Sequence, residues 1–359
     1  LVLGFKELGG WDEMMRVCGA VTVNDYGDTM TNLIRSNDDA NFPWLGALIG
    51  SAIIGFWYWC TDQFIVQRVL SGKNEMEARR GTIFGAYLKL TPVFLFLIPG
   101  MVAFAMQKHG ITVNGETFTM SSADAAFPTL VAKLLPAGFK GLVVCGILAA
   151  LMSSLASLFN SSAMLFTIDF YKKYRPKASE KTLLYVGRVA TVVVVVLGIL
   201  WIPVMKSVGS VLYNYLQDVQ SVLAPGIAAA FLLGICSKKA TPKGGMWGLI
   251  AGFIIGITRL GAKVYYTSGA TFSDSWFKYL FYDTNWLFFC GGMLLFCMLV
   301  IVVVSRFTTP APAEQIVGLT FGSTTDEQKA VTRASWNKWD VIHSAIIILI
   351  TVVFYWYFW

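Results

Sequence analysis

Long hydrophobic runs alternate with short polar segments along the 359-residue chain. Each run is close to the roughly 20 residues that an α-helix needs to cross the hydrocarbon core of a bilayer. The pattern therefore predicts an all-α membrane protein with eight spanning helices. The predicted spans are residues 43–60, 82–106, 141–168, 183–205, 211–236, 244–262, 285–305 and 341–359.

Positive charge predicts which side of the membrane each connecting segment faces. If residue 43 lies outside, the inner segments hold 17 Lys and Arg residues and the outer segments hold 10. The inner segments are then 68–80, 172–188, 238–243 and 306–338, and the outer ones are 1–42, 108–140, 206 and 259–278. This bias favours the stated orientation, because Lys and Arg collect on the cytoplasmic side.

Composition narrows the class of protein further. Hydrophobic residues make up 56% of the chain and charged residues 14%, whereas soluble domains carry about 25% charge. The net charge of +7 is accordingly attributed to cytoplasmic loops and not to nucleic-acid binding. Six cysteines without a CxxC pair and only two histidines predict no zinc site or disulfide framework. No phosphate loop, catalytic triad or carboxylate pair appears in the sequence, so an enzyme is not expected. A channel is still an alternative interpretation, because it too would line a pore with polar groups.

Polar residues in and beside the spans are the candidates for function, since each costs free energy in lipid. In the first span, Gly55, Tyr58, Trp59 and Asp62 are spaced so that a regular helix places them on one face. This spacing predicts a ligand-binding face. The alternative is that Asp62 lies at the inner interface and pairs with Arg68.

Lys89 lies eight residues into the second span, about 12 Å along the helix axis, which is deep for a lysine that reaches headgroups. We expect it to face a cavity or a partner. Its three donors suit hydroxyl-rich ligands as well as anions. The alternative is that it extends back to the cytoplasmic headgroups.

Small and hydroxyl-bearing residues recur in the third span, at Ala150, Ser153, Ser154 and Ser157. Uncharged oxygens hold a hard cation loosely, which predicts a sodium site whose remaining ligands lie elsewhere. The alternative is close helix packing through small residues.

The fifth span begins with polar residues, including Gln217, Asp218 and Gln220, and carries Pro225 and Gly226 near its middle. Proline removes a helical hydrogen bond, so an interrupted helix that exposes backbone groups to a ligand is expected. Gln217 both donates and accepts hydrogen bonds, as a sugar hydroxyl requires. The alternative is a kinked helix with polar residues at the outer interface.

Four long segments occur in the order found in one transporter family. They are WYWCTDQFIVQR (57–68), GAYLKLTPVFLFLIPGM (85–101), LMSSLASLFNSSAMLFTIDFY (151–171) and LQDVQSVLAPGIAAAFLLG (216–234). Through them the sequence resembles the sodium/glucose cotransporters of the solute:sodium symporter family. The block at 238–256 is similar too, with Gly245 where alanine is usual.

The resemblance implies two inverted five-helix repeats with additional helices at the ends. Residues 43–236 would form the second repeat, 237–359 three accessory helices, and 1–42 an extracellular segment after a truncated span, with the first repeat missing. It also implies site residues. For the sugar these are Tyr58, Trp59, Lys89 and Gln217, with Tyr58 as an inner gate, and for sodium they are Ala150, Ser153 and Ser154. Gly55, Asp62 and Gln220 complete the predicted sugar site, because they share helical faces with these residues.

Some positions depart from the family pattern. Gly55 stands where relatives carry Asn or Thr, Gln220 replaces a smaller polar residue, and Ala156 replaces a Thr of two-sodium members. The last of these favours one sodium per cycle. The cysteine-rich outer loop of animal relatives is not found at 108–136, which indicates a bacterial inner-membrane protein. The resemblance thus predicts sodium-coupled symport of a glucose-like or galactose-like sugar, with Na⁺, a sugar and the lipid bilayer as partners. The alternatives are inositol, another polyol or a small anion as substrate, and a sodium channel.

Overall fold

The computed structural model of the protein describes residues 1–208, 212–267, 269 and 275–359. Within those residues eight helical segments are long and apolar enough to cross a membrane. They are Trp44–Thr61, Glu75–Lys108, Ala137–Tyr174, Glu180–Pro203, Leu212–Cys236, Pro242–Thr267, Trp286–Arg306 and Lys338–Tyr357. The eight predicted spans are confirmed. Their ends shift by several residues where a helix continues into polar sequence beyond its apolar run.

Three of these segments contain a turn of π-helix, which a 3.6-residue periodicity does not reveal. η1 (Trp57–Thr61) follows α3 (Trp44–Phe56). The other two join α5 (Glu75–Leu90) through η2 (Val93–Leu97) to α6 (Ile98–Lys108), and α8 (Ala137–Leu165) through η4 (Phe166–Tyr171) to α9 (Lys172–Tyr174). Such turns are often found at functional sites, because they shift the side chains that follow them to a new face.

The remaining spans are uninterrupted helices. They are α10 (Glu180–Val208), α11 (Leu212–Cys236), α12 (Pro242–Thr267), α14 (Trp286–Arg306) and α17 (Lys338–Tyr357). Short elements connect them, namely α13 (Ser275–Lys278), η5 (Tyr279–Asp283), α15 (Ala313–Ile316), η6 (Phe321–Ser323) and α16 (Asp326–Ala334).

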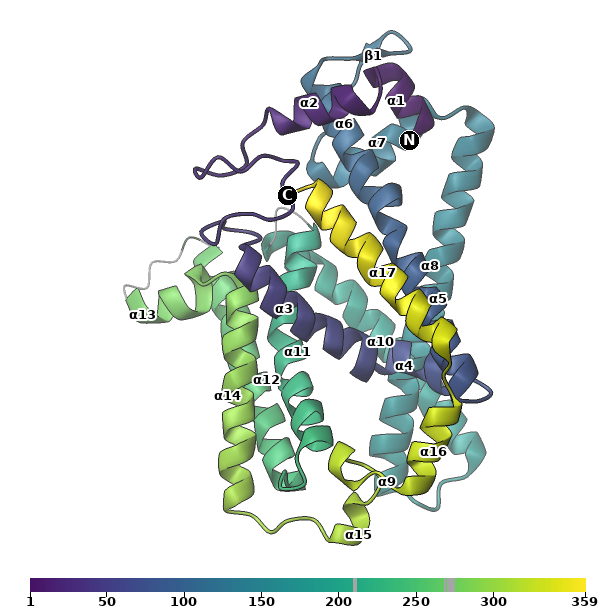
Figure 1. The fold of residues 1–359 in the computed structure, drawn as a ribbon, viewed down its shortest axis with the longest axis vertical. Coiled ribbons are helices and arrows are strands. Elements are labelled where there is room, and N and C mark those ends of the chain that lie inside the picture. The colour runs from purple at the N-terminus through teal and green to yellow at the C-terminus, as the bar shows by residue number, and fades with distance from the viewer. Residues whose placement is uncertain (209–211, 268, 270–274) are drawn as a thin grey trace.

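Several of the connecting elements lie at two opposite ends of the molecule, while α13 lies on one flank (Figure 1). At one end lie α1 (Val2–Leu8), α2 (Trp11–Gly19), α7 (Ala126–Leu134) and strand β1 (Thr112–Val113), and at the other lie α9, α15 and α16. The predicted outer segments 1–42 and 108–140 thus share one end. The predicted inner segments 172–188 and 306–338 share the other, as the predicted orientation requires.

The outer segment 108–136 is more ordered than the loop expected from its sequence. β1 pairs antiparallel with β2 (Glu116–Thr117), and the turn between them has positive φ at Asn114 (51°) and Gly115 (83°). These are the angles of a tight hairpin turn, which Asn-Gly favours. η3 (Ala123–Ala125) precedes α7. Val113 and Phe118 are buried against Met14 and Met106, so the hairpin closes a hydrophobic core with α2 and α6.

α11, α12 and α14 pack together, and α3 lies against α11 and α14. Glycines on one face of α12 allow the close approach. A Cβ on Gly248 would lie 2.4 Å from Cγ1 of Ile301, and one on Gly256 would lie 2.8 Å from Cγ1 of Val222. Small residues at such positions let helices approach in a membrane. A Cβ on Gly245 would meet nothing within 4 Å, so the alanine that is usual there in the family also fits.

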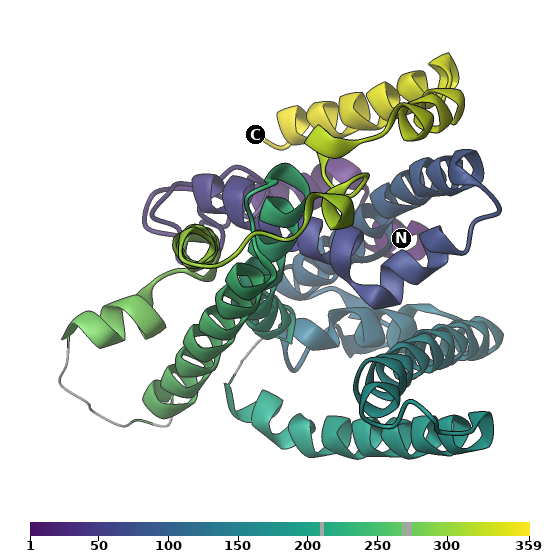
Figure 2. The same ribbon diagram turned by 90° about the horizontal axis from the view of Figure 1, so that it is seen from below.

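α17 lies on one flank of the molecule and α10 on the opposite flank (Figure 2). α17 packs against α5. Its C-terminal end also contacts the outer segment, since the backbone N–H of Leu33 donates to the carbonyl of Phe358 at 2.8 Å. Trp11 Nε1 donates to the hydroxyl of Tyr357 at 3.2 Å. α17 therefore connects the inner half of α5 to the outer end of the molecule.

Candidate functional site

The helix that starts at Trp44 breaks at Asp62. This residue has an extended backbone (φ −75°, ψ 118°) between η1 and α4 (Gln63–Leu70). Its carboxylate accepts a hydrogen bond from the backbone N–H of Phe64 at 3.1 Å, the usual role of an aspartate at a helix N-terminus. Its own N–H donates to the carbonyl of Trp57 at 3.1 Å and closes the π turn. The break separates the aromatic residues of η1 from the polar residues of α4.

The prediction that Gly55, Tyr58, Trp59 and Asp62 share one face of a regular helix is wrong for Asp62. The π turn changes the rotation per residue, and Asp62 lies outside the helix. The alternative pairing of Asp62 with Arg68 is wrong too, because the two residues form no ion pair in the part of the chain that the structure describes. Arg68 Nη2 instead donates to Ser157 Oγ at 3.1 Å. In this structure Asp62 caps α4.

Tyr58, Trp59 and Lys89 are brought together from two spans. The rings of Tyr58 and Trp59 meet edge to face with centroids 5.3 Å apart. Nζ of Lys89 lies 5.6 Å from the centroid of the Trp59 ring, within the range of a cation–π contact. Lys89 is the fifteenth residue of the Glu75–Lys108 segment, near its middle. A partner inside the span was expected for this lysine, and Trp59 is that partner.

Gln217 and Gln220 lie on α11, which packs against α3 and η1. Both side chains are half-buried, and neither makes a hydrogen bond to another described residue. The interruption expected at Pro225 is absent from the described α11, which stays helical from Leu212 to Cys236. Gly226 instead lies close to Gly252 of α12. Within the described residues, the first span is broken at Asp62 and the fifth span is not broken at Pro225.

The serines of α8 fall into two groups. Ser157 and Ser161 accept hydrogen bonds from Arg68 and Gln67 of α4, as the packing alternative predicts. Ser153 and Ser154 are exposed and make no side-chain hydrogen bond to any residue that the structure describes. Ala150 is exposed one turn earlier. The two open hydroxyls are those expected to hold sodium.

A cluster of buried charges joins α11 to α12 and was not expected. Asp218 Oδ1 lies 3.5 Å from Nη2 of Arg259, and Oδ2 contacts Nζ of Lys263. Arg259 is fully buried, donates to the carbonyl of Thr284 at 2.9 Å and lies 4.0 Å from the centroid of Phe289. Arg259 and Lys263, which the predicted orientation counts in an outer segment, lie on the same helix as the sixth span, because α12 continues to Thr267. Their four-residue spacing is the signal that indicates one helical face.

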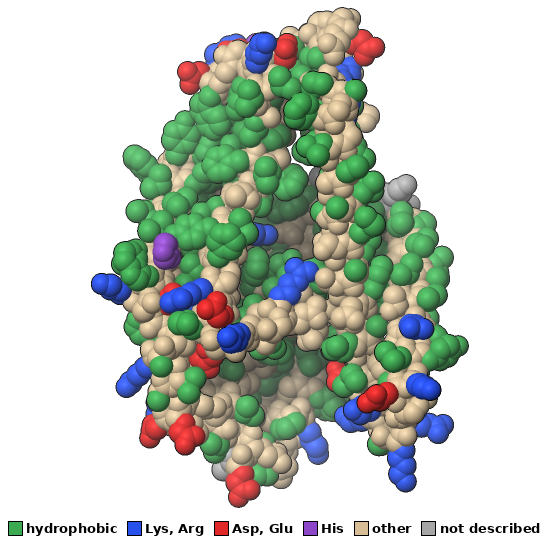
Figure 3. Space-filling view, turned by 90° about the vertical axis from the view of Figure 1, so that its right-hand side faces the viewer, with side chains coloured by type: hydrophobic (Ala, Val, Ile, Leu, Met, Phe, Trp, Pro, Cys, Tyr) green, Lys and Arg blue, Asp and Glu red, His purple; other side chains and the backbone are tan. Residues whose placement is uncertain are grey.

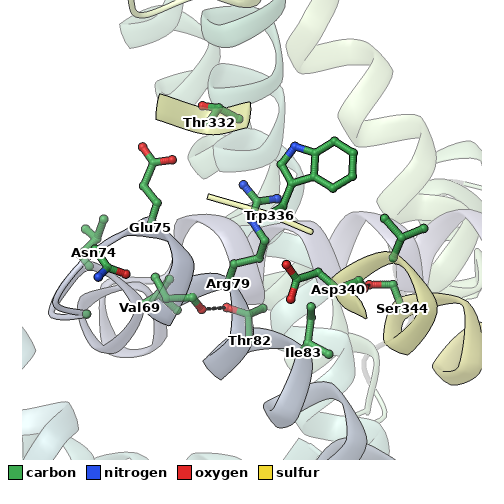
Figure 4. A pocket seen from close by; sticks show the side chains of 14 residues that line it. Val69, Asn74, Glu75, Arg79, Thr82, Ile83, Thr332, Trp336, Asp340 and Ser344 are labelled. Atoms are coloured by element: carbon green, nitrogen blue, oxygen red, sulfur yellow. Dashed lines mark hydrogen bonds between the residues drawn. The ribbon is translucent and has the colours of Figure 1, made fainter. Parts of the chain in front are cut away.

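The side of the molecule shown in Figure 3 is hollowed in its middle. Hydrophobic side chains border the hollow, and Lys or Arg side chains reach into it. A separate pocket of about 900 Å³ lies between α4 and α5 on one side and α16 and α17 on the other (Figure 4). Arg79, Trp336 and Asp340 line it, and none of the predicted site residues does. This pocket is distinct from the predicted site.

Comparison with known proteins identifies the family. The family model described as "Sodium:solute symporter family" matches residues 1–252, which include α3, α5, α8 and α11. The chain belongs to this family. All of the predicted site residues lie within the matched part, so the family match covers both the helix break and the serines of α8.

Curated relatives are similar over most of the chain. Sodium/glucose cotransporter 1 of Ovis aries is 38% identical over 328 residues, which cover 85% of this chain and 49% of the relative. Sodium/glucose cotransporter 4 of Mus musculus is 36% identical, with 89% and 49% covered. A sodium/mannose cotransporter of Bos taurus is 34% identical, with 99% and 64% covered. The chain therefore spans about half the length of the first two relatives. The family and the apolar helices make it a multi-pass membrane protein.

Proposed function

We propose that this protein is a symporter that couples the entry of sodium to the uptake of a sugar. The observation that carries the proposal is the contact of Lys89 with Trp59, beside the helix break at Asp62. Lys89 and Trp59 are both exposed in this chain, but a cation within a membrane-crossing helix is costly in lipid and is therefore expected to face a water-filled substrate path. The relatives, named as cotransporters of sodium with glucose or mannose, support transport over an enzymatic reaction.

The substrate side of the site combines an apolar surface with hydrogen-bonding groups. The rings of Tyr58 and Trp59 offer apolar faces to the C–H groups of a sugar ring, and Lys89 offers three donors. Gln217, on the helix packed against η1, supplies both a donor and an acceptor. Tyr58 acts as the inner gate. Asp62 contributes by holding the break that places Tyr58 and Trp59 beside Lys89.

The sodium side uses the open hydroxyls of Ser153 and Ser154 together with backbone oxygen at Ala150. A hard cation prefers oxygen ligands, and neutral ones release it readily. In this proposal further ligands come from residues outside this chain, because the face of α8 that carries Ser153 and Ser154 is exposed.

The transport cycle follows from two states with different sodium affinities. Sodium stabilises an outward-facing state whose cavity admits the sugar, and rocking of one helix bundle against another then exposes both to the cytoplasm. Residues 43–236 act as the second five-helix repeat, 237–359 as accessory helices and 1–42 as an extracellular segment. We place the protein in the inner membrane of a bacterium, because 108–136 forms a short hairpin and helix without cysteines.

One observation favours a substrate other than glucose. A Cβ on Gly55 would meet nothing within 4 Å, so the position where relatives carry a polar side chain is open. Together with the long side chain of Gln220, this gives the site a different shape at one edge. Inositol or another polyol is the second candidate substrate.

We expect Lys89→Ala to raise the sugar concentration for half-maximal uptake by about tenfold, with Gln217→Ala somewhat less. A hydrogen bond from a charged donor contributes about 1.5–3 kcal/mol, and one from a neutral donor about 1 kcal/mol. The measurement is concentration-dependent uptake of labelled sugar into proteoliposomes. Lys177→Ala, in an exposed inner loop, is the matched control and should behave as the parent. If all three variants reached half-maximal uptake at the same sugar concentration, Lys89 and Gln217 would have structural roles only.

Ser154→Ala should change the sodium dependence of uptake and not its sugar dependence. Loss of one neutral ligand is expected to raise the sodium concentration for half-maximal uptake by about fivefold, since one such interaction contributes about 1 kcal/mol. The sugar dependence, measured at saturating sodium, should stay within twofold of the parent. A Ser154→Ala protein with unchanged sodium dependence would remove this serine from the sodium site.

A further inference from the structure

Two consecutive residues of α4 hydrogen-bond to α8. Gln67 Nε2 donates to Ser161 Oγ at 2.7 Å, and Arg68 Nη2 donates to Ser157 Oγ at 3.1 Å. Ser161 is 3% exposed, and its hydroxyl also donates to the carbonyl of Ser157 at 2.9 Å. We call Gln67, Arg68, Ser157 and Ser161 the α4–α8 latch.

The latch continues the stripe of α8 on which the sodium serines lie. Ser153, Ser157 and Ser161 are four residues apart, so they lie on nearly the same face with steps of about 6 Å along the axis. α4 covers the stripe at Ser157 and Ser161 and leaves it open at Ser153. The open part and the part held by α4 are thus adjacent turns of a single helix.

The N-terminal end of α4 directly follows the helix break at Asp62. α4 has eight residues and is separated from η1 by the extended residue Asp62. A short helix after an extended residue can change direction through a few backbone dihedrals, which is how hinges of domain motion are built. On the far side of the break stand Tyr58 and Trp59. α4 therefore connects the proposed sugar residues to the helix that carries the proposed sodium residues.

We propose that Gln67 and Arg68 are positioning residues that couple sodium binding on α8 to the docking of α4, an inference that rests on the proposed symport. A sodium ion at Ser153 and Ser154 fixes the rotation of α8 about its axis. That rotation presents Ser157 and Ser161 to α4. Because linkage between two sites is reciprocal, docking of α4 raises the sodium affinity by the same factor. Neither Gln67 nor Arg68 needs to touch the ion.

The first test measures the sodium dependence of sugar uptake. Gln67→Ala and Ser161→Ala should each raise the sodium concentration for half-maximal uptake about three- to tenfold, because each removes one partly buried hydrogen bond. The double variant should need about the same sodium concentration for half-maximal uptake as each single variant, since both changes remove the same hydrogen bond. Gln63→Ala and Ser162→Ala are the controls. They lie on the same two helices, make no side-chain hydrogen bond to a described residue, and should match the parent.

The second test follows α4 directly. Hydrogen–deuterium exchange of the unaltered protein in proteoliposomes compares the amides of α4 in sodium and in choline, so that no latch residue is replaced. Sodium should slow their exchange about fivefold or more, in line with ordinary coupling energies. Sodium-dependent uptake in the parent, with unaltered sodium dependence in the variants and equal exchange of α4 in both salts, would overturn the latch and leave symport intact. A parent without sodium-dependent uptake would overturn both.

Discussion

Replacing Asp218 with leucine is expected to lower the free energy of unfolding by about 3–5 kcal/mol, the usual cost of removing one partner from a buried ion pair. The substitution leaves the fully buried Arg259 and the neighbouring Lys263 without their shared carboxylate. The loss should appear as a lower midpoint in thermal unfolding of the protein in detergent, and as a lower free energy in a denaturant titration in mixed micelles.

Two further variants separate this effect from a general sensitivity to lost charge. Asp326→Leu removes a carboxylate that is 98% exposed and paired with Lys329 at 3.0 Å, so its cost should stay within about 1 kcal/mol. The triple variant Asp218→Leu, Arg259→Met, Lys263→Met removes all three charges and should recover much of the loss. An Asp218→Leu protein as stable as the Asp326→Leu protein would show that the buried cluster is not coupled.

Gly256→Ala is expected to cost about 1–3 kcal/mol of stability, as overpacking of a tight interface does. The added Cβ would lie 2.8 Å from Cγ1 of Val222 and 3.1 Å from its carbonyl oxygen. The valine side chain is short and the carbonyl belongs to a helix, so α11 and α12 must move apart. Thermal unfolding in detergent provides the measurement.

The matched control lies on the same helix. A Cβ on Gly261 would meet nothing within 4 Å, and alanine is a better helix former than glycine by about 1 kcal/mol. Gly261→Ala should therefore be neutral or slightly stabilising. Equal melting temperatures for the Gly256→Ala and Gly261→Ala proteins would contradict the close α11–α12 contact.

The spans could be predicted because each rests on a sum over many residues, and an apolar run of about 20 residues is a strong signal. The orientation stays a prediction, which rests on the excess of Lys and Arg on one side. The location of the helix break could not be predicted in the same way. Proline at 225 is the stronger local signal, but a membrane helix accommodates proline when neighbouring helices pack against it. The π turn at Trp57–Thr61 leaves no trace in periodicity.

The candidate site was predictable in its residue types more than in its contacts. The depth of Lys89 within its span required a partner, but nothing local names Trp59, which lies 30 residues away. The pairing of Asp218 with Arg259 and Lys263 joins two helices and was missed because the apolar run seemed to end before Lys263. The stripe of serines on α8 was visible in the sequence. Its division into bonded and open hydroxyls depends on where α4 docks, which is a tertiary contact.

The most direct test of the account is labelled glucose uptake into proteoliposomes under an inward sodium gradient, with an equal potassium gradient as control. Symport predicts saturable accumulation above the external glucose concentration that occurs only with sodium and disappears when the gradient is abolished. Galactose, mannose and inositol in the same assay distinguish the candidate substrates. Uptake that is the same in sodium and potassium, or a sodium current that no sugar alters, would contradict coupling and favour a facilitator or a channel.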